Sequence, residues 1–181
     1  LITVANSKGK TFREAILQDI PRAHDILIEH GLIGKSIVLS NNTATSYLST
    51  GEHHKALETF ESLLTKVRAQ DDTIQRLNLG MIYENIAVTY AYLGQNRQSL
   101  DAREQAQHHF LQNNQVEAML RSQINSTMIL RRLGYYVQAI RLLREAIDTE
   151  WYALQDAGER LLAEKGLIVC YLEVGKFRQA L

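Results

Sequence analysis

Three asparagines at nearly equal spacing are the side chains in this sequence best suited to hold a ligand. Asn42, Asn85 and Asn125 follow one another at intervals of 43 and 40 residues. An asparagine amide offers two hydrogen-bond donors and an acceptor, so it can pair with both sides of a peptide group. A row of such amides would hold an extended backbone without reading its side chains. Alternatively, the amides pair with one another or with neighbouring backbone and stabilise the fold. Both interpretations stay open.

Two short stretches match the end of a phosphate-binding loop, but their surroundings do not fit a nucleotide site. They are GKT at 9–11 and GKS at 34–36. Such a loop needs an earlier glycine, which would fall at Val4 or Glu29, and an apolar strand before it. Because neither requirement is met, we expect no nucleotide site and no cofactor.

Histidine, cysteine and tryptophan occur without the partners that catalysis or metal binding would need. The paired histidines at 53–54 and 108–109 would diverge by about 100° on a helix, so two rings cannot readily close on one metal. Cys170 has apolar neighbours and is expected to be a buried, inert thiol. Trp151 is expected to pack between structural units rather than to bind a ligand. We therefore expect no metal site and no enzyme.

The bulk composition fits a helical protein without a strong electrostatic field. The 181 residues include 20 Lys plus Arg and 20 Asp plus Glu, so no net charge attracts nucleic acid or an anionic membrane. No apolar run approaches the length of a membrane helix. The single cysteine excludes an internal disulfide, and we expect a cytoplasmic location. One proline, few glycines and abundant Ala, Leu, Gln, Glu and Arg favour an all-α chain.

Five glycines recur with a period near 41 residues and divide the chain into similar segments. They are Gly9, Gly51, Gly94, Gly134 and Gly175. The residue four positions before the glycine is tyrosine in three copies, at Tyr47, Tyr90 and Tyr171, and leucine at Leu130. The residue five positions after it is small, as in Ala56, Ser99, Ala139 and Ala180. A fixed period of this length indicates a repeat architecture.

Each copy predicts two helices joined at its glycine. Glycine adopts at little cost the left-handed backbone that closes a helix, and the small residue after it lets the two helices approach closely. One pair cannot bury its apolar face alone, so successive pairs stack. The first helices are predicted at 36–50, 75–93, 116–133 and 157–174. The second helices are predicted at 53–69, 96–112, 136–150 and from 177 onward, after an earlier one at 11–30.

Pro21 and two short stretches mark the expected interruptions of these helices. Pro21 lies inside the earliest predicted helix and should kink or break it. HGLIG at 30–34 and QDD at 70–72 are the clearest predicted loops. The chain starts and stops within a repeat, so we expect both ends to expose apolar faces and to self-associate.

The repeated residues resemble the tetratricopeptide repeat. Its pattern of small residue, aromatic, Gly, Ala and aromatic is matched by Ala44, Tyr47, Gly51, Ala56 and Phe60. The third copy matches at Gly134, Ala139, Leu143 and Ala146. The second copy departs from the pattern, with Ser99 and Arg103 at the alanine and aromatic positions. The period exceeds the usual length of about 34 residues, which is similar to the long-helix repeats of kinesin light chains and bacterial regulators.

The resemblance implies an all-α fold, a right-handed superhelix (α-solenoid) of stacked antiparallel helix pairs. Residues 1–181 would form a single array that is a fragment of a larger protein. Its parts would be a partial repeat at 1–31, three repeats at 36–72, 73–113 and 114–150, and an incomplete repeat at 151–181.

In this family the first helices line a concave groove. The groove residues that the resemblance implies are Asn42, Thr45, Glu84, Asn85, Val88, Tyr92, Asn125, Met128, Arg131 and Arg132. Long-helix members use the asparagine position to hold a peptide, and an arginine can fork onto a carboxylate or phosphate. Alternatively, Arg131 and Arg132 are solvated cations at the end of a helix.

The function implied by the resemblance is a scaffold that binds an extended segment of a protein or peptide. Three amide hydrogen bonds would contribute about 3 kcal/mol, well short of the ~8 kcal/mol of micromolar affinity. The partner should therefore also bury apolar side chains. An alternative is the ligand-sensing region of a bacterial signalling protein or transcriptional regulator. Neither function needs contact with nucleic acid or membrane.

Overall fold

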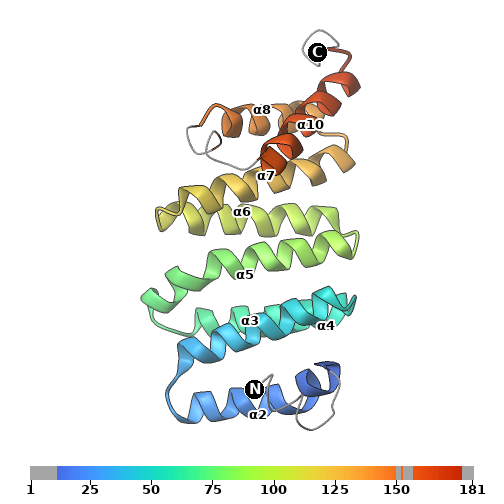
Figure 1. Cartoon of the computed structure of the whole chain (residues 1–181). Helices are drawn as coiled ribbons and strands as arrows, with labels where there is room; N and C mark the ends of the chain where they lie inside the picture. Colours follow the sequence, from blue (N-terminus) through green and yellow to red (C-terminus); the bar gives the residue numbers. More distant parts are fainter. Residues whose placement is uncertain (1–11, 150–151, 153–156, 177–181) are drawn as a thin grey trace. The chain divides into compact units, whose positions relative to one another are not determined.

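Every regular element that the structure describes is an α-helix. The computed structural model describes residues 12–149, 152 and 157–176. The helices labelled in Figure 1 are α2 (Phe12–Glu29), α3 (Ile33–Ser49), α4 (His53–Arg68), α5 (Asp72–Tyr92), α6 (Asn96–Gln112), α7 (Val116–Arg132), α8 (Tyr136–Ile147) and α10 (Ala157–Glu173). The predicted all-α fold class is therefore confirmed.

The chain divides into two compact units, residues 1–78 and residues 79–181. In unit 1, α3 packs against both α2 and α4. In unit 2, α7 packs against α6, α8 and α10, and α8 also packs against α10. Helix α5 begins in unit 1 and belongs to unit 2 from Leu79 onward. The single array with repeats at 36–72, 73–113, 114–150 and 151–181 stays a prediction.

A glycine in the left-handed conformation follows each of α2, α3, α5, α7 and α10. These residues, Gly31, Gly51, Gly94, Gly134 and Gly175, have φ values of 68°, 79°, 74°, 80° and 72°. After α7, the amide of Gly134 donates to the carbonyl of Arg131 at 3.0 Å, and the amide of Tyr135 donates to the carbonyl of Leu130 at 2.8 Å. These bonds satisfy carbonyls that a helix end otherwise leaves open. The predicted role of the repeat glycines is confirmed at four positions, and Gly9 lies outside the described residues.

Replacing Gly134 by alanine is expected to lower the free energy of unfolding by about 1 kcal/mol, because an L side chain is strained at this φ. Replacing it by asparagine should cost less, since Asn114 adopts a φ of 56° after α6 in the same chain. Urea denaturation of both variants measures the difference. Equal losses would show that backbone strain is not the reason for glycine here.

The small residues after the repeat glycines are buried where two helices meet, as the sequence predicts. Ala56, Ser99 and Ala139 are completely inaccessible to solvent. The hydroxyl of Ser99 donates to the carbonyl of Ala87 on α5 at 2.8 Å. A serine is accepted at this position because its polar group is satisfied. Ala180 lies outside the described residues.

The structure differs from three expectations about where the helices are interrupted, begin or end. The break expected at Pro21 is absent, since helix α2 runs from Phe12 to Glu29, and the alternative of a kink stays a prediction. Helix α3 begins at Ile33, so the predicted loop at 30–34 is shorter, and its closing residue is Gly31. Helix α8 ends at Ile147, three residues before the predicted end.

Cys170 belongs to the core of unit 2, as the sequence predicts. It packs with Leu130 and Ala139 and is inaccessible to solvent. Burial raises the pKa of the Cys170 thiol above its usual range, against a smaller lowering effect of Arg131. An inaccessible thiol with a raised pKa is a poor nucleophile. Trp151 lies outside the described residues.

Candidate functional site

Arg103 on α6 occupies a position that is apolar in the helix pairs α3–α4 and α7–α8. Counted nine residues from the repeat glycine, its equivalents are Phe60 and Leu143, both buried. Arg103 is itself only 6% exposed. A buried guanidinium must be paired and hydrogen-bonded to be tolerated. The buried arginine at this otherwise apolar position therefore indicates a polar site inside unit 2.

Glu84 on α5 is the centre of the network around Arg103. Its carboxylate lies 3.4 Å from Arg103 Nε, and it accepts a hydrogen bond from Ser122 Oγ at 2.6 Å. It also accepts a longer bond from Asn125 Nδ2 at 3.3 Å. Arg103 Nη1 donates to the backbone carbonyl of Asn125 at 2.8 Å. Side chains from α5, α6 and α7 are thus joined through one carboxylate.

The pKa of Arg103 reflects the balance between burial and pairing. Burial lowers the pKa of the guanidinium, and the charge and hydrogen bond of Glu84 raise it. Arginine nevertheless keeps its proton in proteins. The network therefore holds one positive and one negative charge side by side under ordinary conditions.

A hollow of about 280 Å³ lies over this network, between α5 and α7. We call it the α5–α7 hollow; its lining residues are Val88, Ala91, Tyr92, Arg103, Asn125, Met128, Ile129 and Arg132. Five of these were predicted as groove residues from the sequence. Ala91, Arg103 and Ile129 were not, although the charge of Arg103 at an aromatic position was a visible signal.

The rim of the α5–α7 hollow combines exposed apolar surface with a cation. Tyr92 is 64% exposed and Met128 is 44% exposed. Arg132 is exposed at the end of α7 and forms no ion pair with the residues that the structure describes. An arginine without an internal partner is available to a carboxylate or phosphate from another molecule.

A second hollow lies between α7 and α10 and shares Met128 and Arg132 with the first. This α7–α10 hollow, of about 290 Å³, is also lined by Arg131, Tyr136, Val169 and Glu173. Arg131 differs from Arg132, because its Nε is buried and has no hydrogen-bond partner among the described residues. The two arginines therefore lie along continuous surface of unit 2, but only Arg132 reaches both hollows.

Gly166 on α10 stands where the earlier repeats have an asparagine, nine residues before the glycine. A Cβ at this position would lie 3.7 Å from Arg131 Nη1 and 3.4 Å from Leu143. Both distances are ordinary van der Waals contacts, so a Cβ would be accommodated and crowding at that atom does not explain the glycine.

The lining of the α5–α7 hollow does not include the predicted groove residues Asn42, Thr45 and Asn85. Asn42 and Thr45 lie exposed on α3 in unit 1, where the Thr45 hydroxyl donates to the carbonyl of Asn41 at 2.9 Å. Asn85 is half-buried on α5 and is not among the lining residues that the structure describes. Asn125 lines the hollow, but its amide also donates to Glu84. Whether the asparagine row binds a ligand stays a prediction.

The other histidine and metal candidates have ordinary surroundings. His109 stacks on Tyr83, with ring centroids 5.6 Å apart, while His54 and His108 are exposed. Within the described ranges, three potential metal ligands do not come together anywhere. Across the same ranges, no helix has the length and apolarity needed to cross a bilayer.

Solved structures share this arrangement of helices. MamA superposes with a TM-score of 0.65, at 14% identity, over 97% of this chain and 85% of MamA. The TPR-like repeats of a kinesin light chain from Podosopora anserina give a TM-score of 0.62, at 17% identity, over 93% of this chain and 85% of theirs. The fold is that of tetratricopeptide-like repeat proteins.

A third solved structure extends the comparison without changing its meaning. BtubC from P. vanneervenii superposes with a TM-score of 0.55, at 16% identity, over 92% of this chain and 84% of BtubC. Identities this low establish the fold alone. No protein-family model matches the sequence, and no curated protein does either. Membership of the long-period variety stays a prediction.

Proposed function

We propose that this chain is a protein-interaction scaffold that holds an extended segment of another protein on unit 2. The segment would lie in the α5–α7 hollow, with an acidic group on Arg132 and apolar side chains on Tyr92 and Met128. The observation that carries the proposal is the combination of exposed apolar surface with an exposed arginine that no described residue neutralises. The tetratricopeptide-like fold is compatible with this function but does not decide it.

The charge distribution favours an acidic partner over a neutral one. Glu84 neutralises Arg103 beneath the hollow, so the remaining charge at its rim is that of Arg132. An acidic side chain or a terminal carboxylate could form two parallel bonds with this guanidinium. A basic segment would meet repulsion at the same place, which gives selectivity as well as affinity.

Apolar contacts are needed to complete the affinity. A charged hydrogen bond contributes about 1.5–3 kcal/mol, whereas micromolar binding needs about 8 kcal/mol. Burying one leucine-sized side chain of the partner adds about 1.5–3 kcal/mol. Two such anchors against Val88, Tyr92 and Met128 would close most of the gap. A segment with aliphatic residues flanking an acidic residue fits this surface.

A random 12-residue peptide library displayed on phage tests the proposal. Selected peptides should be enriched in Asp or Glu beside aliphatic residues. Arg132→Ala should weaken their binding about tenfold in fluorescence polarisation. Arg97→Ala, on the exposed face of α6 and outside the hollow, is the matched control and should have no effect. Peptides without acidic residues, or equal losses in both variants, would contradict the proposed function.

A second function is the ligand-sensing region of a signalling protein or transcriptional regulator. The observation that favours it is a hollow of about 240 Å³ in unit 1, whose lining includes hydroxyl, imidazole and ammonium groups. This is smaller than the pockets of about 300–1,000 Å³ that hold drug-sized molecules. A sensor of this kind would respond to a small polar metabolite rather than to a peptide.

A further inference from the structure

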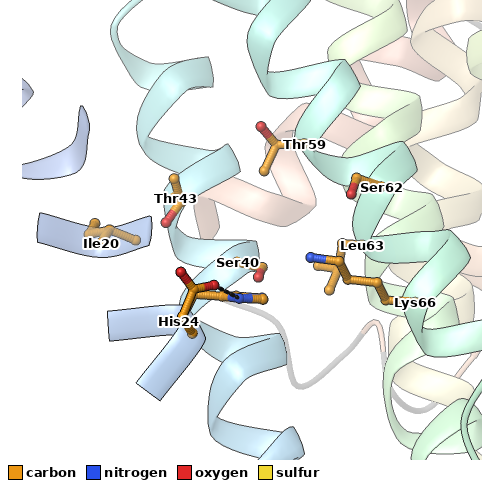
Figure 2. A pocket seen from close by; sticks show the side chains of 9 residues that line it. Ile20, His24, Ser40, Thr43, Thr59, Ser62, Leu63 and Lys66 are labelled. Carbon is orange, nitrogen blue, oxygen red and sulfur yellow. Dashed lines mark ion pairs between the residues drawn. The ribbon is translucent and has the colours of Figure 1, made fainter. Parts of the chain in front are cut away.

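Seven of the nine residues that line the hollow in unit 1 have side chains that form hydrogen bonds, although carbon atoms contribute most of its surface. It lies among α2, α3 and α4 and has a volume of about 240 Å³, the space of roughly eight water molecules. Figure 2 shows His24, Ser40, Thr43, Thr59, Ser62 and Lys66 around it. Hydroxyl groups from two helices and one ammonium group therefore face a common space.

Three of these groups have donors to offer. The ammonium of Lys66 forms no ion pair with the residues that the structure describes, and the hydroxyls of Ser40 and Ser62 donate to none of them. In Figure 2 the Lys66 side chain extends toward Ser40 and the His24 ring. The Asp25 carboxylate also lines the hollow but forms no ion pair with Lys66, so the ammonium can donate to an anion from solution.

The two threonines contribute acceptors instead of donors. The Thr43 hydroxyl donates to the carbonyl of Leu39 at 2.8 Å, and the Thr59 hydroxyl donates to the carbonyl of Lys55 at 2.7 Å. The two hydroxyl protons are already used in these hydrogen bonds, and the lone pairs of the two oxygens can accept a hydrogen bond from a ligand. A ligand that suits this hollow has several acceptor oxygens and one O–H group.

His24 lies between the opposing charges of this site. Burial and the nearby Lys66 lower the pKa of His24, while Asp25, 3.9 Å from its Nδ1, partly offsets this effect. Among the described lining residues, α2 contributes Asp25, α4 contributes Lys66, and α3 contributes no charge. The lowered pKa favours the neutral form of His24, and a bound anion would favour its protonation.

We propose that this hollow binds the phosphate group of a small molecule, held by Lys66 and by the hydroxyls of Ser40 and Ser62. Phosphate fits better than a carboxylate, because its oxygens can reach donors on two helices while a protonated oxygen donates to a threonine. His24 adds a charged donor when it takes up a proton. The site lies in unit 1 and is independent of the peptide surface of unit 2.

Histidine ring NMR on the full chain, with inorganic phosphate as the probe, tests this site. The chain has six histidines, and His24→Gln assigns the signal of His24. Phosphate should raise the pKa of His24 and leave the other histidines unchanged. Lys66→Gln should weaken phosphate binding about tenfold or more, and Ser62→Ala should weaken it several-fold. Both side chains are exposed enough for these variants to fold, which circular dichroism verifies.

The control is Lys55→Gln on the same helix, because Lys55 pairs with Glu52 and lies outside the hollow. It should bind phosphate like the unmodified chain. Sodium acetate at matched ionic strength should leave the pKa of His24 nearly unchanged. The proposal is wrong if phosphate does not move His24, if the two lysine variants lose binding equally, or if acetate acts as strongly as phosphate.

Discussion

Replacing Arg103 by leucine is expected to lower the free energy of unfolding by about 2 kcal/mol. The change leaves Glu84, whose side chain is 19% exposed, without its cation, and removal of one partner from a buried pair is strongly destabilising. The cost falls below the largest values because Ser122 and Asn125 still donate to the carboxylate. Leucine itself fits, since Leu143 fills the equivalent position. Urea denaturation measures the effect.

A double-mutant cycle separates the charge from the packing. In Arg103→Leu/Glu84→Gln the buried charge is gone, while the glutamine oxygen still accepts from Ser122. The double variant should therefore be more stable than the sum of the two single losses by at least about 1 kcal/mol. Arg141→Leu breaks an exposed pair with Glu145 and should cost less than about 0.5 kcal/mol. Strictly additive losses would show that Glu84 and Arg103 do not depend on each other.

Replacing Gly80 by alanine is expected to destabilise the protein by about 1–2 kcal/mol. A Cβ at this position would lie 2.6 Å from the ring of Phe110, a distance that forces the ring or the helix to move. Because 2.6 Å is far inside contact distance, the cost of overpacking should fall in the upper part of its usual range, about 2–3 kcal/mol, and alanine returns about 1 kcal/mol through its higher helix propensity. Phe110 is only 8% exposed, so the ring has little free space to enter.

Two further variants give this prediction its controls. Gly34 lies in α3, and no atom comes within 4 Å of the place that an added methyl group would take, so Gly34→Ala should be neutral or stabilising by up to about 1 kcal/mol. Phe110→Leu should recover part of the loss when combined with Gly80→Ala, because the smaller side chain vacates the contact. A Gly80→Ala variant as stable as the unmodified chain would mean that α5 and α6 are not held this closely.

Most of the fold could be predicted from the repeat period, because the residues that define the period act on the backbone next to them. A left-handed glycine ends a helix through its own backbone, so Gly134 and its equivalents could be recognised without knowledge of any partner. Ser99 followed the same rule, with a hydroxyl that finds a nearby carbonyl. The break expected at Pro21 did not occur, because a proline only weakens a helix and the residues on either side can continue it. Asn114 was missed because it lies between the periodic glycines.

The candidate site depends on contacts between helices, which spacing reveals less well. Glu84 and Arg103 are each visible as charges on predicted helices, but their pairing depends on how α5 and α6 pack. When a charged residue stands at a core position that is aromatic in another repeat, a partner of opposite charge can be sought on the preceding helix. The hollow of unit 1 had no such signal, since His24, Ser40 and Lys66 come from three helices and follow no period.

Methyl NMR of the methionines tests the proposed peptide surface most directly. The chain has only three methionines, and Met128 lines the α5–α7 hollow, whereas Met81 and Met119 do not. Adding a peptide selected from the library should shift the ε-methyl signal of Met128 in proportion to occupancy and leave the other two unchanged. A bound peptide that shifts Met81 or Met119 while Met128 stays fixed would contradict the account.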